Sequence, residues 1–295
     1  EREYGIPGSK IFLIPHGIPQ TSFEPSEKFK TLYDLEGKTV LSTFGLLSPN
    51  KGVEYAIRAL PEIVKKYPDV IYLVLGVTHP AIRAQNGEAY RTFLMREAEQ
   101  LGLKNNVKFY NKYLTLEEVV NYLKATDIYI SPAIDPEQSV SGTLSYALGC
   151  GRPAIATESI YAKYIISEEN GILVKQKDSS QIKNALLNLL QDPKRVKSMG
   201  GGAYELSRKM IWPNVAAEYF KLYQKFADLG QEEGKMPPIK MDHIIRLTDD
   251  FGILQFAQYS KPQKRYGYTL DDNARALIAC AKCYEKNFDP EILAL

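Results

Sequence analysis

The stretch SPAIDPEQSVSGTLSYALGCGRPAIATES, residues 131–159, contains in one run the end of a strand, a polar loop, a helix and the next strand, and so indicates the architecture of the chain. Its apolar stripe predicts a helix from Leu144, which the glycines at 149 and 151 end, and a strand follows at residues 154–157. The loop before the helix carries small polar residues, namely Gln138, Ser139, Ser141, Gly142 and Thr143. Such a loop before a helix N-terminus suits an anion, so we expect a phosphate-bearing ligand here.

Short apolar strands alternate with helices on both sides of this stretch. We expect strands at residues 11–14, 39–45, 70–76, 107–110, 128–131 and 171–174, and helices at 53–67, 88–101, 116–125, 180–190, 194–210 and 215–229. The alternation predicts an α/β fold with a doubly wound parallel sheet. Ligands of such sheets lie beyond the strand carboxyl ends, where the loops after residues 45, 76, 110 and 131 should converge.

A domain boundary is predicted near the C-terminus. Residues 230–240 are polar and charged and contain Pro237 and Pro238, which indicates a linker. We therefore expect one domain at residues 1–229 and the start of an all-α domain at 241–295, with helices at 244–259 and 270–284. Glycines 200–202 predict a break in the helix at 194–210. The chain begins at Glu1 and ends within a helical pattern, so we expect a fragment of a longer protein.

The composition excludes several classes of protein. The chain of 295 residues has 37 basic and 35 acidic side chains, and this near-neutral balance argues against a nucleic-acid partner. Three cysteines are too few for a disulfide framework, which favours a reducing compartment, the cytoplasm. No apolar run approaches the roughly 20 residues that span a bilayer.

Several motifs follow one another in an order typical of one enzyme family. They are FGLL at residues 44–47 with Lys51 and Gly52, THP at 78–80, GEAYR at 87–91, Gln138 with SGTL at 141–144, and AY at 203–204 with RKMIW at 208–212. Together they resemble the C-terminal, donor-binding half of a retaining GT-B glycosyltransferase (family 4, group 1 type), in a bacterial and archaeal branch. Residues 248–250 and 267–275 resemble the start of a helical, toroid-like domain that often follows.

The resemblance implies which residues bind a nucleotide-sugar donor. They are Gly45, Lys51, Gly52, His79, Arg91, Asn111, Tyr113, Gln138, Ser141, Gly142 and Thr143. In the wider family an arginine and a lysine hold the donor diphosphate; Lys51 matches the lysine, but Leu46 stands in the place of the arginine. Two phosphates need charge neutralisation, so another cation should compensate, Arg91 first and His79 beside it.

Each of these residues also has a structural interpretation. Lys51 could be a solvated turn lysine, and Arg91 an exposed helix arginine that pairs with Glu88. Ser141 or Thr143 could cap the helix, which is compatible with phosphate binding. The loop at residues 110–113 is either the base-binding turn that the resemblance implies or an ordinary strand-to-helix connection.

Two family carboxylates are replaced. The wider family has glutamates eight positions apart, near the transferred sugar and on the ribose, where this sequence has Gln138 and Tyr146. Glutamine carries no charge to stabilise a cationic transition state, so the catalytic residue is unknown. Two functions stay open. One is retaining transfer of a hexose to a glycan or glycolipid; the other is a non-catalytic sugar-nucleotide or glycan binding module.

Further predictions concern partners and cofactors. We expect no metal site, because His16, His79 and His243 lack ligand spacing, and no cofactor apart from the nucleotide-sugar substrate. The CxxC pair, Cys280 and Cys283, is interpreted as helix cysteines. The N-terminal GT-B half would be missing from this chain, and a glycolipid acceptor is compatible with peripheral membrane association of the full protein. A reserve hypothesis places glycoside chemistry on the aspartate pairs at 249–250 and 271–272.

Overall fold

The computed structural model describes residues 7–226, 241–258 and 261–287. The chain divides into two compact units, Glu1–Ala227 and Asp228–Leu295. The linker predicted at residues 230–240 lies outside the described residues.

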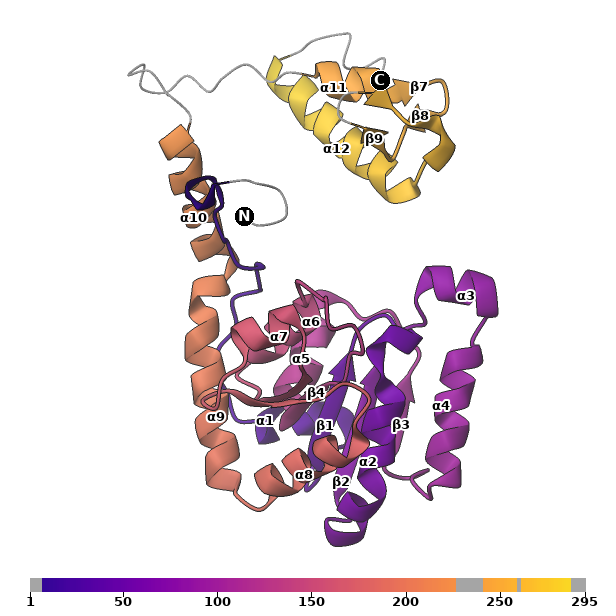
Figure 1. The fold of residues 1–295 in the computed structure, drawn as a ribbon, viewed down its shortest axis with the longest axis vertical. Coiled ribbons are helices and arrows are strands. Elements are labelled where there is room, and N and C mark those ends of the chain that lie inside the picture. The colour runs from indigo at the N-terminus through magenta and orange to yellow at the C-terminus, as the bar shows by residue number, and fades with distance from the viewer. Residues whose placement is uncertain (1–6, 227–240, 259–260, 288–295) are drawn as a thin grey trace. The chain divides into compact units, whose positions relative to one another are not determined.

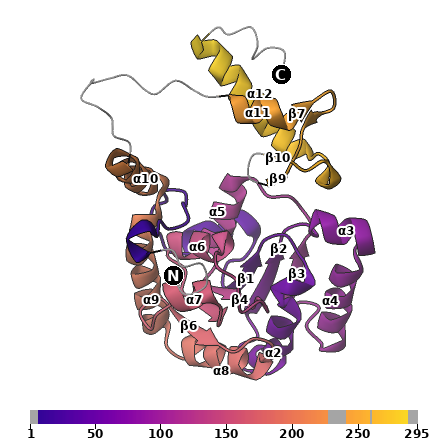
Figure 2. The same cartoon turned by 45° about the horizontal axis from the view of Figure 1, so that its top comes forward.

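The first unit is built on a six-stranded sheet in the order β3-β2-β1-β4-β5-β6. The strands are β1 (Thr39–Phe44), β2 (Val70–Leu75), β3 (Val107–Tyr110), β4 (Ile128–Ser131), β5 (Ala154–Thr157) and β6 (Gly171–Val174). All neighbouring strands pair in parallel, and β3, β2, β1 and β4 lie next to one another in Figure 2. The predicted doubly wound α/β fold is therefore confirmed.

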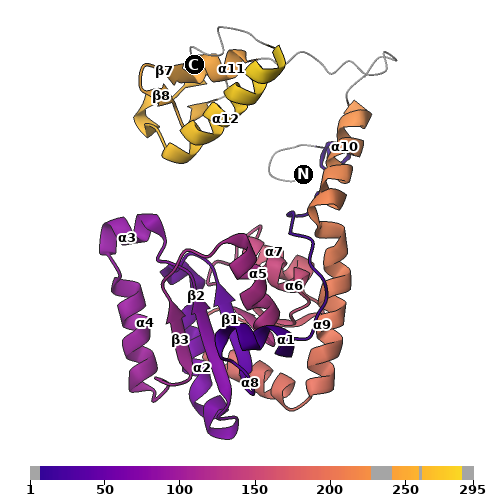
Figure 3. The same ribbon diagram turned by 180° about the vertical axis from the view of Figure 1, so that it is seen from behind.

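Helices cover both faces of this sheet (Figures 1 and 3). One core packs β-strand residues against α2 (Val53–Lys66), α4 (Ala89–Gln100) and α8 (Ser179–Leu190). The other core packs the opposite face against α5 (Leu116–Ala125), α6 (Gly142–Gly149) and α7 (Ile160–Ile165). All six residues of β2 are buried, because the strand is covered on both faces.

Further helices complete the unit. They are α1 (Glu27–Lys30), α3 (Pro80–Asn86), α9 (Pro193–Ser207) and α10 (Trp212–Phe226). The sequence did not predict α3, which begins where the side chain of His79 accepts a hydrogen bond from the backbone of Ala81.

The strand order places a topological switch point between β1 and β4. The chain moves outward to β2 and β3 on one side and to β5 and β6 on the other. Because the connections on the two sides run over opposite faces, a crevice opens at the carboxyl ends of β1 and β4. The loops after these two strands are therefore the first place to look for a ligand site.

The strand predicted at residues 11–14 is wrong. Ile11 is 52% exposed and Leu13 is 73% exposed, and no strand forms there. An apolar run makes a buried strand only where neighbours cover it, and here the backbone pairing occurs later, as a bridge between Ile18 and Ile211. The N-terminal segment is thus fixed at Ile18 rather than within the sheet.

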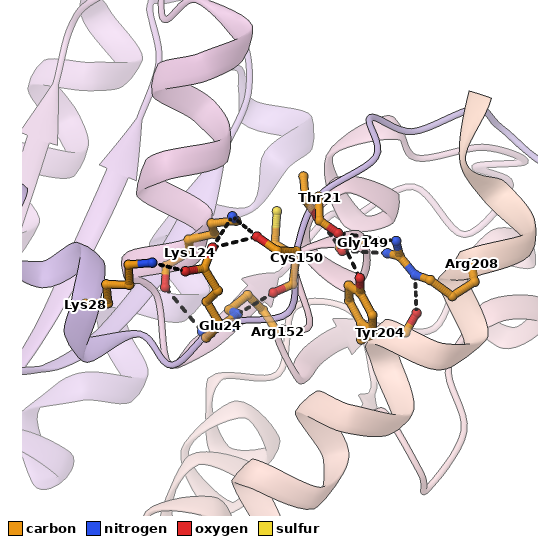
Figure 4. A network of polar contacts seen from close by, with 10 residues as sticks. Thr21, Glu24, Lys28, Lys124, Gly149, Cys150, Arg152, Tyr204 and Arg208 are labelled. Carbon is orange, nitrogen blue, oxygen red and sulfur yellow. Dashed lines mark hydrogen bonds and ion pairs between the residues drawn. The ribbon is translucent and has the colours of Figure 1, made fainter. Parts of the chain in front are cut away.

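A polar network ties this segment to the ends of α5 and α6 (Figure 4). Thr21 Oγ1 donates to the carbonyl of Gly149 at 2.9 Å, and Arg208 Nη2 donates to the same carbonyl at 2.9 Å. Arg152 Nη2 donates to the carbonyl of Glu24 at 2.8 Å. The network satisfies the carboxyl end of α6 and so helps to hold that helix in place.

The helix break predicted at glycines 200–202 is also wrong, since α9 runs from Pro193 to Ser207 through all three. Two of the three, Gly200 and Gly202, serve close packing instead. A Cβ on Gly200 would lie 2.8 Å from the carbonyl oxygen of Gly151, and one on Gly202 would lie 2.2 Å from that of Glu169. Only residues without a side chain allow the helix to approach these backbones so closely.

The second unit contains α11 (Asp242–Leu247), α12 (Leu270–Asn287) and four two-residue strands, β7 (Thr248–Asp249), β8 (Gly252–Ile253), β9 (Ala257–Gln258) and β10 (Lys261–Pro262). The helix predicted at residues 244–259 is therefore wrong beyond Leu247. Gly252 has a φ of +130°, which turns the chain back on itself, and the Asn273 side chain accepts from the Ile253 backbone at 2.9 Å. Cys280 and Cys283 are buried on α12, as expected of helix cysteines.

Candidate functional site

Three residues from separate elements converge at the carboxyl end of β1. A Cβ on Gly45 would lie 3.3 Å from Thr143 Cγ2 and 3.4 Å from Lys51 Nζ. Gly45 has a φ of +139°, a backbone conformation that side chains rarely allow. The strand end, the lysine of the following loop and the first turn of α6 therefore meet at one point.

The loop after β1 is fixed on the loop after β4. Gly52 has a φ of +62°, and a Cβ there would lie 2.2 Å from the carbonyl oxygen of Pro132. The Ile134 backbone also donates to the carbonyl of Asn50 at 3.1 Å. These close contacts hold Lys51 in position before any ligand binds.

The Lys51 ammonium is half-buried and unpaired. Among the described residues no hydrogen bond or ion pair engages it, and burial lowers the pKa of the ammonium from its ordinary value. It lies beside the N-terminus of α6, which Ser141 caps by accepting from the Leu144 backbone at 3.4 Å. A cation and the positive end of a helix thus face one another without an anion between them.

The hollow at this point is small. Its volume is about 10 Å³, and its wall includes Lys51, Gln138, Ser141 and Thr143. A nucleotide cannot fit inside so little space, so a ligand would lie across the opening. Gln138 lines the hollow while its neighbour Glu137 is exposed, which places the amide rather than the carboxylate at the site.

Arg91 is buried, in contrast to an exposed helix arginine. Its Nη2 donates to the carbonyl of Gly76 at 2.7 Å, and its Nε lies 3.2 Å from Glu88 Oε2. Nη1 is buried and has no hydrogen-bond partner. Arg91 therefore fixes the loop after β2 at Gly76, and its contact with a ligand stays a prediction.

The other predicted residues lie on neighbouring loops rather than at the hollow. His79 follows β2, and its Nδ1 accepts from the Ala81 backbone at 3.2 Å. Asn111 and Tyr113 follow β3, the edge strand, and Tyr113 is 77% exposed. The structure therefore brings Gly45, Lys51, Gln138, Ser141 and Thr143 together, with Gly52 behind Lys51 and Gly142 opening α6.

The sequence prediction missed His16. A Cβ on Gly142 would lie 3.2 Å from His16 Nε2, so the imidazole rests on the first turn of α6. Its ring centre lies 6.2 Å from that of Tyr146. From the sequence, a histidine between Pro15 and Gly17 indicates only a turn. Its position beside α6 depends on the pairing of Ile18 with Ile211, which lies far along the chain.

A much larger cavity lies elsewhere, at the amino ends of β1, β4 and β5. Its volume is about 780 Å³, and its lining includes Lys30, Asp127 and Arg152. These charges are already engaged, since Lys30 Nζ lies 2.8 Å from Asp127 Oδ2 and Arg152 donates to the Glu24 carbonyl. By volume this cavity is the better candidate for a ligand site. The switch point between β1 and β4 is the better candidate for an anion, because it holds an unpaired positive charge.

The described part of the chain contains neither a candidate metal site nor a candidate membrane-spanning helix. Within residues 7–226, 241–258 and 261–287, no cluster of three or more histidine, cysteine, aspartate or glutamate side chains is arranged to hold a metal. None of the helices in these ranges combines the length and the apolar character needed to cross a membrane.

Comparison with protein families gives one match. The family model described as "Glycosyl transferases group 1" covers residues 25–206. A GDP-mannose-dependent monoacylated alpha-(1-6)-phosphatidylinositol monomannoside mannosyltransferase of Corynebacterium glutamicum is 29% identical over 212 residues, 68% of this chain and 52% of the relative. A phosphatidyl-myo-inositol mannosyltransferase of Mycobacterium leprae is 27% identical over 76% of this chain and 56% of the relative. The chain spans about half the length of these curated relatives.

Solved structures share the fold. Sucrose-phosphate synthase from Thermosynechococcus elongatus superposes with a TM-score of 0.64 at 23% identity, over 72% of this chain and 52% of that chain. Anabaena HepE in complex with UDP and glucose superposes with a TM-score of 0.60 at 21% identity, over 71% of this chain and 53% of that chain. The C-terminal domain of LpcC from Francisella tularensis has a TM-score of 0.57 at 24% identity, over 69% of this chain and 98% of that domain.

Proposed function

The chain belongs to the group 1 glycosyl transferases, and we propose that its first unit binds the nucleotide-sugar donor of a retaining glycosyltransferase. The observation that carries this proposal is the unpaired Lys51 ammonium beside the N-terminus of α6. Both features attract a diphosphate, and neither is neutralised by a neighbouring carboxylate among the described residues.

The same arrangement suits the chemistry of transfer. When the bond between the anomeric carbon and the phosphate oxygen breaks, negative charge grows on the departing diphosphate. Lys51 and the positive end of α6 are fixed in place to stabilise that charge, because the loops around Gly45 and Gly52 are rigidly packed. The sugar passes to an acceptor hydroxyl, and Gln138 lies where it can hydrogen-bond to sugar hydroxyls.

We take this unit as the C-terminal half of a GT-B enzyme. Three observations support this part of the proposal: the hollow holds only about 10 Å³, the curated relatives are about twice as long as the matched region, and a solved C-terminal domain is covered over 98% of its length. The acceptor-binding half would supply the facing wall. The second unit would then be the start of an appended helical domain.

The relatives suggest which substrates to test first. Their names specify GDP-mannose and phosphatidylinositol-based acceptors, while one solved neighbour holds UDP and glucose. We propose a nucleoside diphosphate hexose as donor and a glycan or glycolipid as acceptor, with a peripheral membrane contact of the whole protein if the acceptor is a lipid.

Two observations favour a second function, a non-catalytic sugar-nucleotide or glycan binding module. Leu46 is 37% exposed beside the site, and Gln138 rather than a carboxylate lines the hollow. Binding without turnover of any nucleotide sugar by the full-length protein would support the module. Turnover that Lys51→Ala abolishes would exclude it.

A thermal-shift panel tests the binding function directly. At a ligand concentration one hundred times its Kd, binding adds about 2.7 kcal/mol, which raises Tm by roughly 5–10 °C for a domain of this size. UDP, GDP and their hexose derivatives should produce such shifts with the wild type and with Lys65→Ala, an exposed lysine on α2. They should not do so with Lys51→Ala. Absence of any shift with the wild type would overturn the proposed function.

A further inference from the structure

A diphosphate offers more hydrogen-bond acceptors than Lys51 alone can satisfy. Leu46, at the edge of the site, supplies neither charge nor hydrogen-bond donor. The buried guanidinium of Arg91 already engages Gly76 and Glu88. The first turn of α6 therefore needs a second donor from another part of the chain.

His16 occupies the required place. The imidazole contacts α6 at Gly142, where a Cβ would lie 3.2 Å from Nε2 and 3.3 Å from Cε1. Lys51 lies near the adjacent residue, Thr143, because Lys51 Nζ and Thr143 Cγ2 are both within 3.4 Å of the position that a Cβ on Gly45 would take. Both side chains thus lie near the first turn of α6, His16 at Gly142 and Lys51 on the side of Thr143.

The backbone that follows His16 is held by hydrogen bonds and packing. The Ile18 backbone donates to the carbonyl of Met210 at 2.8 Å, and the Trp212 backbone donates to the carbonyl of Ile18 at 3.1 Å. A Cβ on Gly17 would lie 2.4 Å from the Trp212 ring. His16 is consequently presented by a fixed turn rather than by a mobile segment.

The two ring nitrogens of His16 differ in their surroundings. Nδ1 is buried and has no hydrogen-bond partner, and among the described residues no hydrogen bond engages Nε2. An N–H on Nδ1 would be buried without an acceptor, so we place the proton of the neutral ring on Nε2. Nε2, the ring nitrogen beside Gly142, is then a hydrogen-bond donor.

We propose that His16 is a donor-binding residue whose Nε2–H contacts a phosphate oxygen of the nucleoside diphosphate, opposite Lys51 across the first turn of α6. This inference rests on the proposed donor-binding function. It gives His16 a hydrogen-bonding role at the phosphates, whereas the sequence suggested Arg91 as a compensating cation.

The shapes of asparagine and glutamine allow a matched test. The glutamine amide nitrogen reaches about as far as Nε2, while the asparagine amide reaches only as far as Nδ1. Ligand-observed NMR titrations of UDP, GDP and the parent nucleosides against the chain should show that His16→Asn weakens diphosphate binding by at least about tenfold. His16→Gln should weaken it by less than about threefold, and neither variant should change nucleoside binding.

The outcomes separate the inference from the function beneath it. If the wild type binds neither UDP nor GDP, the proposed function fails and the inference with it. If the wild type binds a diphosphate and His16→Asn binds it equally well, the inference alone fails. Equal losses in His16→Asn and His16→Gln, or a parallel loss of nucleoside binding, would show a structural role and would also overturn it. Thermal unfolding of each variant confirms that it is folded before titration.

Discussion

Replacing Lys51 by methionine should stabilise the ligand-free chain and weaken its diphosphate binding. Methionine keeps most of the aliphatic stem that packs beside Gly45, and it removes an ammonium that is half-buried, unpaired and lowered in pKa by burial. Residues that serve function often destabilise the folded chain, and replacing one of them typically raises the free energy of unfolding by about 1 kcal/mol. For a unit of this size the gain corresponds to a rise in Tm of about 2–4 °C.

The same substitution removes a charge-assisted hydrogen bond to phosphate, which contributes about 1.5–3 kcal/mol. Diphosphate affinity should therefore fall by about tenfold to a hundredfold. Thermal unfolding with and without UDP or GDP measures both effects on one sample. Lys65→Met, at an exposed position on α2, should change neither.

The stability difference should also depend on pH. In the unfolded chain Lys51 keeps its proton up to its ordinary pKa of 10.5, whereas the folded chain releases it at lower pH. Wild-type stability relative to Lys51→Met therefore rises as pH increases through the folded pKa toward 10.5. A destabilised Lys51→Met variant, or one that binds diphosphate like the wild type, would refute this reasoning.

Further substitutions test the packing that positions the site. Gly202→Ala should lower the free energy of unfolding by about 2 kcal/mol, because its Cβ would lie 2.2 Å from the Glu169 carbonyl oxygen. Gly201→Ala should raise the free energy of unfolding by about 0.5–1 kcal/mol, because its Cβ would meet nothing within 4 Å. Denaturant unfolding measures both changes. Gly52→Ala should lower the free energy of unfolding by about 2–4 kcal/mol, since both its φ of +62° and a carbonyl oxygen at 2.2 Å oppose a side chain; an unchanged midpoint would contradict the packing described. Cys150, whose pKa burial raises to about 11, should resist alkylation at about pH 8 until the protein unfolds, as mass spectrometry would show.

The sheet could be predicted from the sequence because its signals are local. Each of the six strands is a short apolar run followed by a helical repeat, so the order of elements fixes a parallel α/β sheet. The glycine-rich stretch of α9 could not be interpreted locally. Its role is contact with the backbones of Gly151 and Glu169, which lie far away in the sequence.

The candidate site likewise combines residues that could be predicted from the sequence with a residue whose position depends on distant contacts. The convergence of the loops after residues 45 and 131 follows from the strand order, whereas Lys51 was implied by the resemblance; the structure brings Gly45, Lys51 and Thr143 close together. His16 could not be predicted, because its position depends on the bridge between Ile18 and Ile211. The helix predicted at residues 244–259 failed for a related reason: the contact between Ile253 and Asn273 favours a hairpin over local helix propensity.

We expect a nucleoside diphosphate to bind at the carboxyl ends of β1 and β4, beside α6. Backbone amide NMR shifts during a titration with UDP and GDP would locate the binding site on the chain. The largest changes should occur at Gly45, Gly142 and Thr143. Changes confined to residues that line the cavity of about 780 Å³, such as Gly37 and Lys197, or no changes at all, would contradict it.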